Sequence, residues 1–106
     1  MSIHANSYID GAGGLFFGNN ISIAHNCSVL TAEHDWTNRS LPIKYNEVKL
    51  KETKLADDIW IGCGSRILGG TSIGNRVVIG ANSVVKGEVF NDSIYVGVPA
   101  RRIKEI

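Results

Sequence analysis

The residues best suited to proton transfer near neutral pH are three histidines, and one of them lies between two acidic residues. His34 stands between Glu33 and Asp35 in the stretch TAEHDW. A neutral imidazole can take a proton from a weak nucleophile, such as an alcohol, while that nucleophile attacks. A carboxylate or a backbone carbonyl on the second ring nitrogen would fix the tautomer and stabilise the imidazolium. The sequence leaves open which group, if any, does this for His34.

A scaffold for these side chains is indicated by a repeat of six residues. Written in sixes from residue 55, every unit of the second half begins with an aliphatic residue, and every fifth residue is small or β-branched. The first positions are Leu55, Ile61, Ile67, Ile73, Ile79 and Val85, and the fifth are Ile59, Ser65, Thr71, Val77, Ser83 and Val89. Second positions include the turn glycines Gly62, Gly74 and Gly80. A short self-similar period predicts stacked units that share one core, here an all-β parallel β-solenoid with two inward positions per unit.

The first half of the chain keeps this frame with two interruptions. Its units begin at Ile3, Ile9, Phe17, Ile23 and Val29, so two extra residues lie between the second and third starts. After Val29 the next good start is Leu55, which predicts one long inserted loop at about 35–54. Long loops on rigid scaffolds are commonly functional, and this one contains Trp36 and Tyr45. His34 precedes the loop, at an expected outside corner of the solenoid.

Composition and charge exclude several classes of protein. A chain of 106 residues predicts one domain, residues 1–106, and twelve glycines against two prolines favour many turns. A net charge of +1 with 20% charged residues argues against a general nucleic-acid binder. No apolar run approaches the roughly twenty residues of a membrane span and no signal region follows Met1, which favours a cytoplasmic protein. Cys27 and Cys63 have neither metal nor disulfide spacing and are expected to be reduced thiols.

Four features together resemble the hexapeptide-repeat acyltransferases: the sixfold repeat, TAEHDW at 31–36, DDIWIG at 57–62, and GVPARRIKEI at 97–106. The resemblance is strongest to O-acetyltransferases of the maltose, galactoside and polysaccharide type. It implies a left-handed parallel β-helix with a C-terminal tail, a homotrimer, and transfer of an acetyl group from acetyl-CoA to a sugar hydroxyl without a metal. The chain lacks the helical N-terminal segment of longer members and one or more coils, so a short or N-terminally truncated form is expected.

The resemblance also assigns roles to individual residues. His34 matches the histidine that serves as general base. Six residues match positions that contact coenzyme A: Trp60, Cys63, Ala81, Lys86, Arg101 and Lys104. Lys86 is displaced by one place, because relatives carry Thr-Lys where this chain has Lys86 and Gly87. His4 and its neighbour Asn6 match the vicinity of the acceptor.

Three alternatives remain beside this interpretation. The same fold and coenzyme could serve an N-acetyltransferase of an amino sugar or an antibiotic acetyltransferase, because acceptor pockets lie in loops. A noncatalytic β-helix used for trimerisation or binding would keep the repeat but needs neither His34 nor the loop. A zinc site like that of the γ-class carbonic anhydrases would require an HxxxxH pair, which is not present.

Overall fold

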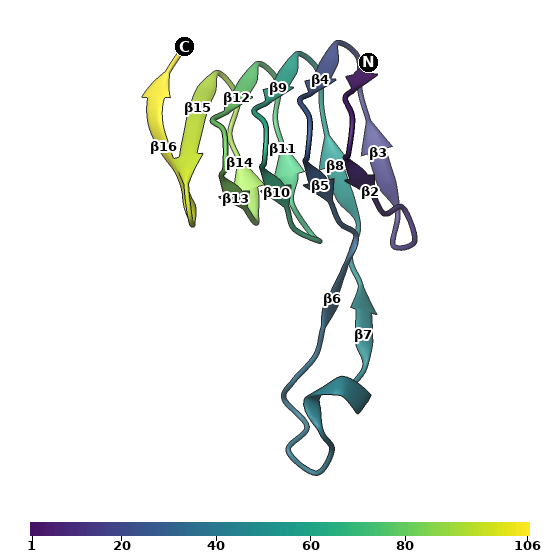
Figure 1. The fold of residues 1–106 in the computed structure, drawn as a ribbon. Helices are drawn as coiled ribbons and strands as arrows, with labels where there is room; N and C mark the ends of the chain where they lie inside the picture. The colour runs from purple at the N-terminus through teal and green to yellow at the C-terminus, as the bar shows by residue number, and fades with distance from the viewer.

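Each six-residue unit forms one short strand and one turn, and three units complete one coil of a left-handed parallel β-helix. The computed structural model describes residues 1–106, and Figure 1 shows its coils stacked side by side. The strands of successive coils form three sheets, named sheets 1, 2 and 3 in the order in which each coil visits them. The predicted all-β parallel fold is confirmed.

The bounds of the strands follow the repeat. Sheet 1 contains β1 (Ser2–Ile3), β4 (Ile21–Ile23), β9 (Ile59–Ile61), β12 (Val77–Ile79), β15 (Ser93–Gly97) and β16 (Ala100–Glu105). Sheet 2 contains β2 (Tyr8–Ile9), β5 (Ser28–Val29), β10 (Arg66–Ile67) and β13 (Val84–Val85). Sheet 3 contains β3 (Leu15–Phe17), β8 (Thr53–Leu55), β11 (Ser72–Ile73) and β14 (Glu88–Val89).

The core is a column of side chains from the first and fifth positions of the repeat. All twelve predicted inward residues of the second half are buried. First positions stack in register from coil to coil, as in the row Ile23, Ile61 and Ile79. The polar fifth positions are tolerated because their hydroxyls donate to backbone carbonyls: Ser65 and Ser83 both donate to Gly80 O, at 3.1 and 2.7 Å.

The turns depend on the fourth position of the repeat, which adopts a left-handed backbone conformation. Its occupants are mostly Asn and Asp, which tolerate positive φ better than other side chains; Asn82, for example, has φ 57°. The second-position glycines have a different role. A Cβ on Gly62 would lie 2.6 Å from the backbone nitrogen of Ala81, so glycine there lets two coils approach closely.

All variation in coil length occurs at the corner between sheets 2 and 3, named the 2–3 corner. The two extra residues after Ile9 and the long insertion after Val29 both lie there. The same corner is shortened in the last coil, because Val89 pairs with Ile73 and so occupies a first position rather than the predicted fifth. Val89 is buried in either frame.

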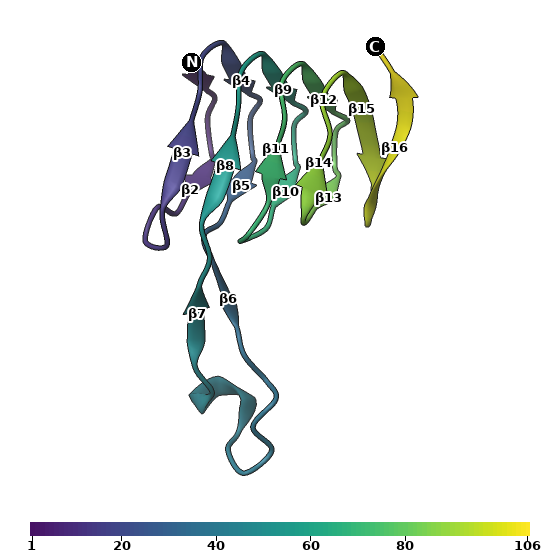
Figure 2. The same ribbon diagram turned by 180° about the vertical axis from the view of Figure 1, so that it is seen from behind.

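The inserted segment forms an arm, defined here as residues 32–52, that projects away from the β-helix (Figure 2). Its strands β6 (Ala32–His34) and β7 (Val48–Leu50) pair antiparallel, and a 3-10 turn, η1 (Ile43–Tyr45), lies near its tip. The excursion begins at Ala32 rather than Asp35 and ends before Thr53 rather than after Lys54. The boundaries differ from the prediction because residues 32–34 are held by pairing with 48–50.

The predicted C-terminal tail is a strand. After β15 the chain reverses, and β16 pairs antiparallel with β15 along the edge of sheet 1. This places Arg101 and Lys104 on the same sheet as Trp60.

Candidate active site

His34 lies on β6, on the exposed first strand of the arm, rather than at the outside corner of a coil. Its Nε2 lies 2.5 Å from the carbonyl oxygen of Ile43, which belongs to η1. A carbonyl oxygen can only accept, so Nε2 carries the proton and the lone pair of the neutral ring is on Nδ1. The arm thus folds back on itself and orients His34 with Nδ1 free to accept a proton.

Neither neighbouring carboxylate orients the imidazole. Asp35 Oδ1 accepts hydrogen bonds from the backbone nitrogens of Trp36 and Thr37, at 2.7 and 3.0 Å, and from the Thr37 hydroxyl at 2.9 Å. The bonds from Thr37, more than any other contact, lower the pKa of Asp35. Asp35 therefore shapes the turn after β6.

Glu33 forms ion pairs with two lysines. Its Oε1 lies 2.7 Å from Lys51 Nζ and its Oε2 3.1 Å from Lys86 Nζ. Hydrogen bonds from Lys51 and then Lys86 are the largest causes that lower the pKa of Glu33. Lys86, for which a coenzyme A contact is predicted, lies at the 2–3 corner of the last coil and contacts the arm through Glu33.

The root of the arm is packed tightly against the coils. A Cβ on Gly13 would lie 2.0 Å from the carbonyl oxygen of Thr31, and a Cβ on Gly69 would lie 2.8 Å from the backbone nitrogen of Ala32. The buried hydroxyl of Thr31 accepts from Gly13 N at 2.8 Å and donates to Asp10 O at 2.9 Å. Backbone contacts to the coils on both sides therefore fix the place where the arm leaves the β-helix.

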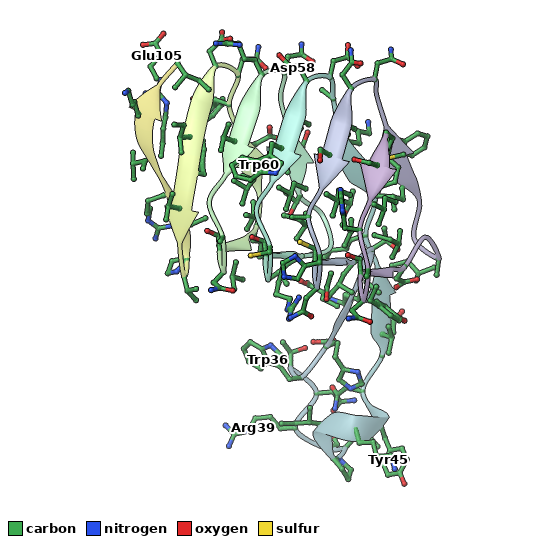
Figure 3. All side chains as sticks on the ribbon, turned by 45° about the horizontal axis from the view of Figure 1, so that its top comes forward. Trp36, Arg39, Tyr45, Asp58, Trp60 and Glu105 are labelled. Carbon is green, nitrogen blue, oxygen red and sulfur yellow. The ribbon has the colours of Figure 1, made fainter.

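Asn46 organises the tip of the arm, and sequence reasoning missed it. It is the one buried residue of the arm: its Oδ1 accepts from Asn38 N, and its Nδ2 donates to the carbonyls of Asn38 and Pro42. These bonds close the loop that carries the Ile43 carbonyl to His34. An asparagine two residues before a strand gave no signal of its own in the sequence. Figure 3 shows Trp36, Arg39 and Tyr45 on this part of the arm, with Trp36 and Arg39 on one side and Tyr45 on the other.

The outer face of sheet 1 carries an apolar row that ends at a cation. In register, Trp60 lies beside Val78, Val78 beside Ile94, and Ile94 beside Lys104. Trp60 is 52% exposed and is seen on this outer face in Figure 3. It lines a pocket of about 290 Å³ together with Ser22, Arg76, Val78 and Ile106.

The cations of β16 do not all face the same way. Arg101 pairs with Val96 and Lys104 with Ile94, which are outward positions of β15. Arg102 instead donates from Nε to the buried Ser93 Oγ at 2.7 Å. Arg101 and Lys104 are therefore the two tail cations available on the outer face.

The other predicted residues lie at the corner between sheets 1 and 2. Cys63 and Ala81 stand in neighbouring coils, and the Cys63 carbonyl accepts from Asn82 N at 2.8 Å. His25 occupies the matching position of the coil before, and His4 and Asn6 belong to the first coil. Asn6 has φ 61° and is one of the left-handed turn residues. Within one chain, His4 and Asn6 are thus at a different corner from the one that carries the arm and His34.

The hexapeptide coils also match a known sequence family. The sequence profile described as bacterial transferase hexapeptide (six repeats) matches residues 52–87. The chain belongs to this hexapeptide-repeat family.

Relatives cover most of the chain, but the chain covers only part of them. It is 32% identical to a probable acetyltransferase of Mycobacterium tuberculosis over 99 residues, which is 93% of this chain and 32% of the relative. A structure of a variant of AntD, an N-acyltransferase from Bacillus cereus, in complex with dTDP-4-amino-4,6-dideoxyglucose and coenzyme A, superposes with a TM-score of 0.84 at 32% identity, covering 95% of this chain and 57% of that one. A galactoside acetyltransferase in complex with coenzyme A gives 0.85 at 29% identity, covering 93% and 48%. The chain therefore spans between a third and somewhat over half of these proteins.

Two further findings concern membranes and metals. None of the helical segments is long and apolar enough to cross a membrane. No cluster of three or more His, Cys, Asp or Glu side chains is placed to hold a metal ion.

Proposed function

We propose that this chain is an acetyl-CoA-dependent O-acetyltransferase that acetylates a sugar or polysaccharide-precursor hydroxyl, with His34 as general base. The observation that carries the proposal is the bond between His34 Nε2 and the Ile43 carbonyl, which leaves Nδ1 as a proton acceptor on a fixed arm. The similarity to acetyltransferases supports the reaction type.

The proposed chemistry is direct transfer. The acceptor oxygen attacks the thioester carbonyl carbon while its proton passes to His34 Nδ1. The carbon–sulfur bond then breaks, and the imidazolium returns the proton to the sulfur of coenzyme A. The products are an acetyl ester and free coenzyme A thiol, and the hydrogen bond from Nε2 to Ile43 O strengthens as the ring becomes positive.

The outer face of sheet 1 has the features that coenzyme A requires. The apolar row of Trp60, Val78 and Ile94 suits a pantetheine arm, and Arg101 and Lys104 would meet phosphates at one end of it. Cys63 and Ala81 lie on the corner beside this sheet, where backbone groups of turns could pair with the pantetheine amides. Replacing both cations, in an Arg101→Ala, Lys104→Ala variant, should weaken coenzyme A binding more than binding of the 3′-dephospho form.

We also propose that the active enzyme is a homotrimer in the cytoplasm, the compartment that supplies acetyl-CoA. A groove between two copies would bring the corner with His4 and Asn6 of one copy toward the arm of another, which a single chain does not do. The arm exposes Leu41, Ile43, Val48 and Leu50, which a neighbouring copy would cover. Light scattering should give three times the mass of the 11.5 kDa chain, and a monomer would contradict both the assembly and the site.

A second candidate is N-acylation of an amino sugar. It is favoured by the similarity to AntD, whose structure holds an amino-sugar nucleotide together with coenzyme A. The base and the coenzyme site would be the same, and only the acceptor atom would differ.

The experiment is an acceptor screen in which released coenzyme A thiol is detected, with matched hydroxyl and amine forms of each sugar. His34→Ala should lower kcat by about a hundred- to ten-thousandfold and leave coenzyme A affinity near the parental value. His25→Ala is the control, because His25 is an exposed histidine at another corner. Undiminished transfer by His34→Ala, or loss of transfer in His25→Ala instead, would contradict the assignment.

A further inference from the structure

Glu33 joins two parts of the chain that are far apart in sequence. Lys51 lies at the end of the arm, just before β8, whereas Lys86 follows β13 in the last complete coil. One carboxylate receives both, with one oxygen for each ammonium. The arm leaves the second coil, so the contact with Lys86 spans the third coil.

The coil in between is built to permit this contact. Gly69 and Gly70 form its 2–3 corner, and a Cβ on Gly69 would meet the Ala32 backbone. Without that Cβ, the arm root lies directly on the third coil. The last coil has a short corner between Val85 and Val89, which leaves the Lys86 side chain free to extend back to Glu33.

The carboxylate is charged at neutral pH. The hydrogen bonds from Lys51 and Lys86 lower its pKa, and both lysines contribute further through their charge. Asp35 and Lys49, two other charged residues of the arm, pair with each other at 3.8 Å. Glu33 therefore acts as the acceptor for the two lysines and takes no proton from His34.

We propose that Glu33 and Lys86 are positioning residues, which hold the arm at a fixed angle to the β-helix and thereby set the location of His34. This inference rests on the proposed role of His34 as base. Under this proposal Lys86 contacts Glu33 within the protein, whereas the sequence predicted a contact with coenzyme A.

The expected effect is smaller than that of losing the base. Glu33 and Lys86 have side chains 35% and 59% exposed, and ion pairs at such sites contribute weakly and are screened by salt. Loss of the pair should loosen the arm and reduce the fraction of molecules with His34 in place. We expect kcat to fall by roughly three- to tenfold, with little change in coenzyme A affinity.

The test compares Lys86→Met, Glu33→Gln and the double variant, with acetyl transfer and coenzyme A affinity measured for each. If the two residues act through one another, the double variant should be no slower than Glu33→Gln alone. Lys86→Arg keeps the charge and should restore most of the rate. Lys54→Met is the matched control, because Lys54 is an equally exposed lysine on β8 that pairs with Glu52, only two residues away in sequence, and so does not join the arm to another coil. Multiplying effects in the double variant, or a large loss of coenzyme A affinity in Lys86→Met, would overturn the proposal.

A second measurement needs no activity and so separates this inference from the proposed function. In a Trp60→Phe background, Trp36 is the only tryptophan and reports arm motion through fluorescence anisotropy. Lys86→Met should lower the anisotropy of Trp36, and 1 M salt should lower it in the parent but not further in the variant. If the protein acetylates no acceptor but the anisotropy falls as expected, the arm contact stands and only the proposed function fails. Equal anisotropy in parent and variant would overturn the proposal even in an active enzyme.

Discussion

The Gly69→Ala substitution should lower kcat although it changes none of the residues proposed to act in the reaction. Gly69 has no unusual backbone angle, so alanine is compatible with its conformation, and the effect must come from the added methyl group. That group would lie 2.8 Å from the Ala32 nitrogen and 3.0 Å from the Ala32 oxygen, both backbone atoms at the root of the arm.

The size of the effect follows from these distances. An ordinary contact begins at about 3.4 Å, so the arm root must move away by roughly 0.6 Å. A displacement of about 1 Å at a catalytic group can cost on the order of a hundredfold in rate, so a tenfold fall in kcat is expected. Overpacking should also cost about 1 kcal/mol of stability, at the low end of its usual range, because the arm can shift as a unit.

The assay is acetyl transfer at saturating coenzyme, followed by released thiol, together with thermal unfolding of the same samples. Gly11→Ala is the control: Gly11 lies at the same corner of the first coil, and nothing stands within 4 Å of the place that a Cβ would occupy there. It should behave as the parent. If Gly69→Ala retains the parental kcat and melting temperature, Gly69 does not determine the position of the arm.

Three further predictions test the scaffold and its charges. Ile79→Ala should destabilise the protein by about 2–5 kcal/mol in urea unfolding, because the side chain is fully buried, whereas Ile103→Ala, at a 64% exposed position, should be nearly neutral. Asn82→Ala should lower stability by about 1–2 kcal/mol because its φ is 57°, while Asn82→Gly should lose far less; equal losses would show that the backbone conformation is not the cause. The lowered pKa of Glu33 means that its contribution to stability is complete above the ordinary value of 4.5 and is lost as the pH falls through the lowered value. The melting temperatures of the parent and of Glu33→Gln should therefore converge as the pH is taken below 4.5, and a gap that persists at pH 2 would contradict the ion pairs.

Much of the β-helix could be predicted because its core has a strict period. The first and fifth positions of the repeat, occupied for example by Ile61 and Val77, face inward in every coil, so the sequence pattern alone located these residues. The turns were harder to predict from the sequence. Their left-handed position is held by Asn82 in one turn and by Arg76 in another, and arginine is not a typical turn residue. The six-residue repeat also did not show that Val89 takes a first position. A valine fits the fifth position of a continued repeat and the first position after a shortened corner equally well.

The sequence suggested which residues make up the candidate site but not how they are arranged. His34 was proposed from its residue type and its place before the long insertion. Its partner, the carbonyl of Ile43, is a backbone atom nine residues away, and no side-chain pattern can indicate it. The pairing of Lys86 with Glu33 joins residues 53 positions apart, across a coil whose glycines permit the approach.

Confinement of all length variation to the 2–3 corner has an evolutionary consequence. Val29 and Leu55 remain stacked on Ile67 and Ile73 although a whole arm separates them in sequence, so the core is unaffected by the size of what leaves there. Insertions at this corner can be exchanged, lengthened or redesigned, whereas the other two corners keep one fixed length from coil to coil. Under the proposed function, a new acceptor specificity could therefore be introduced by exchanging the insertion at this one corner, without any change to the coils.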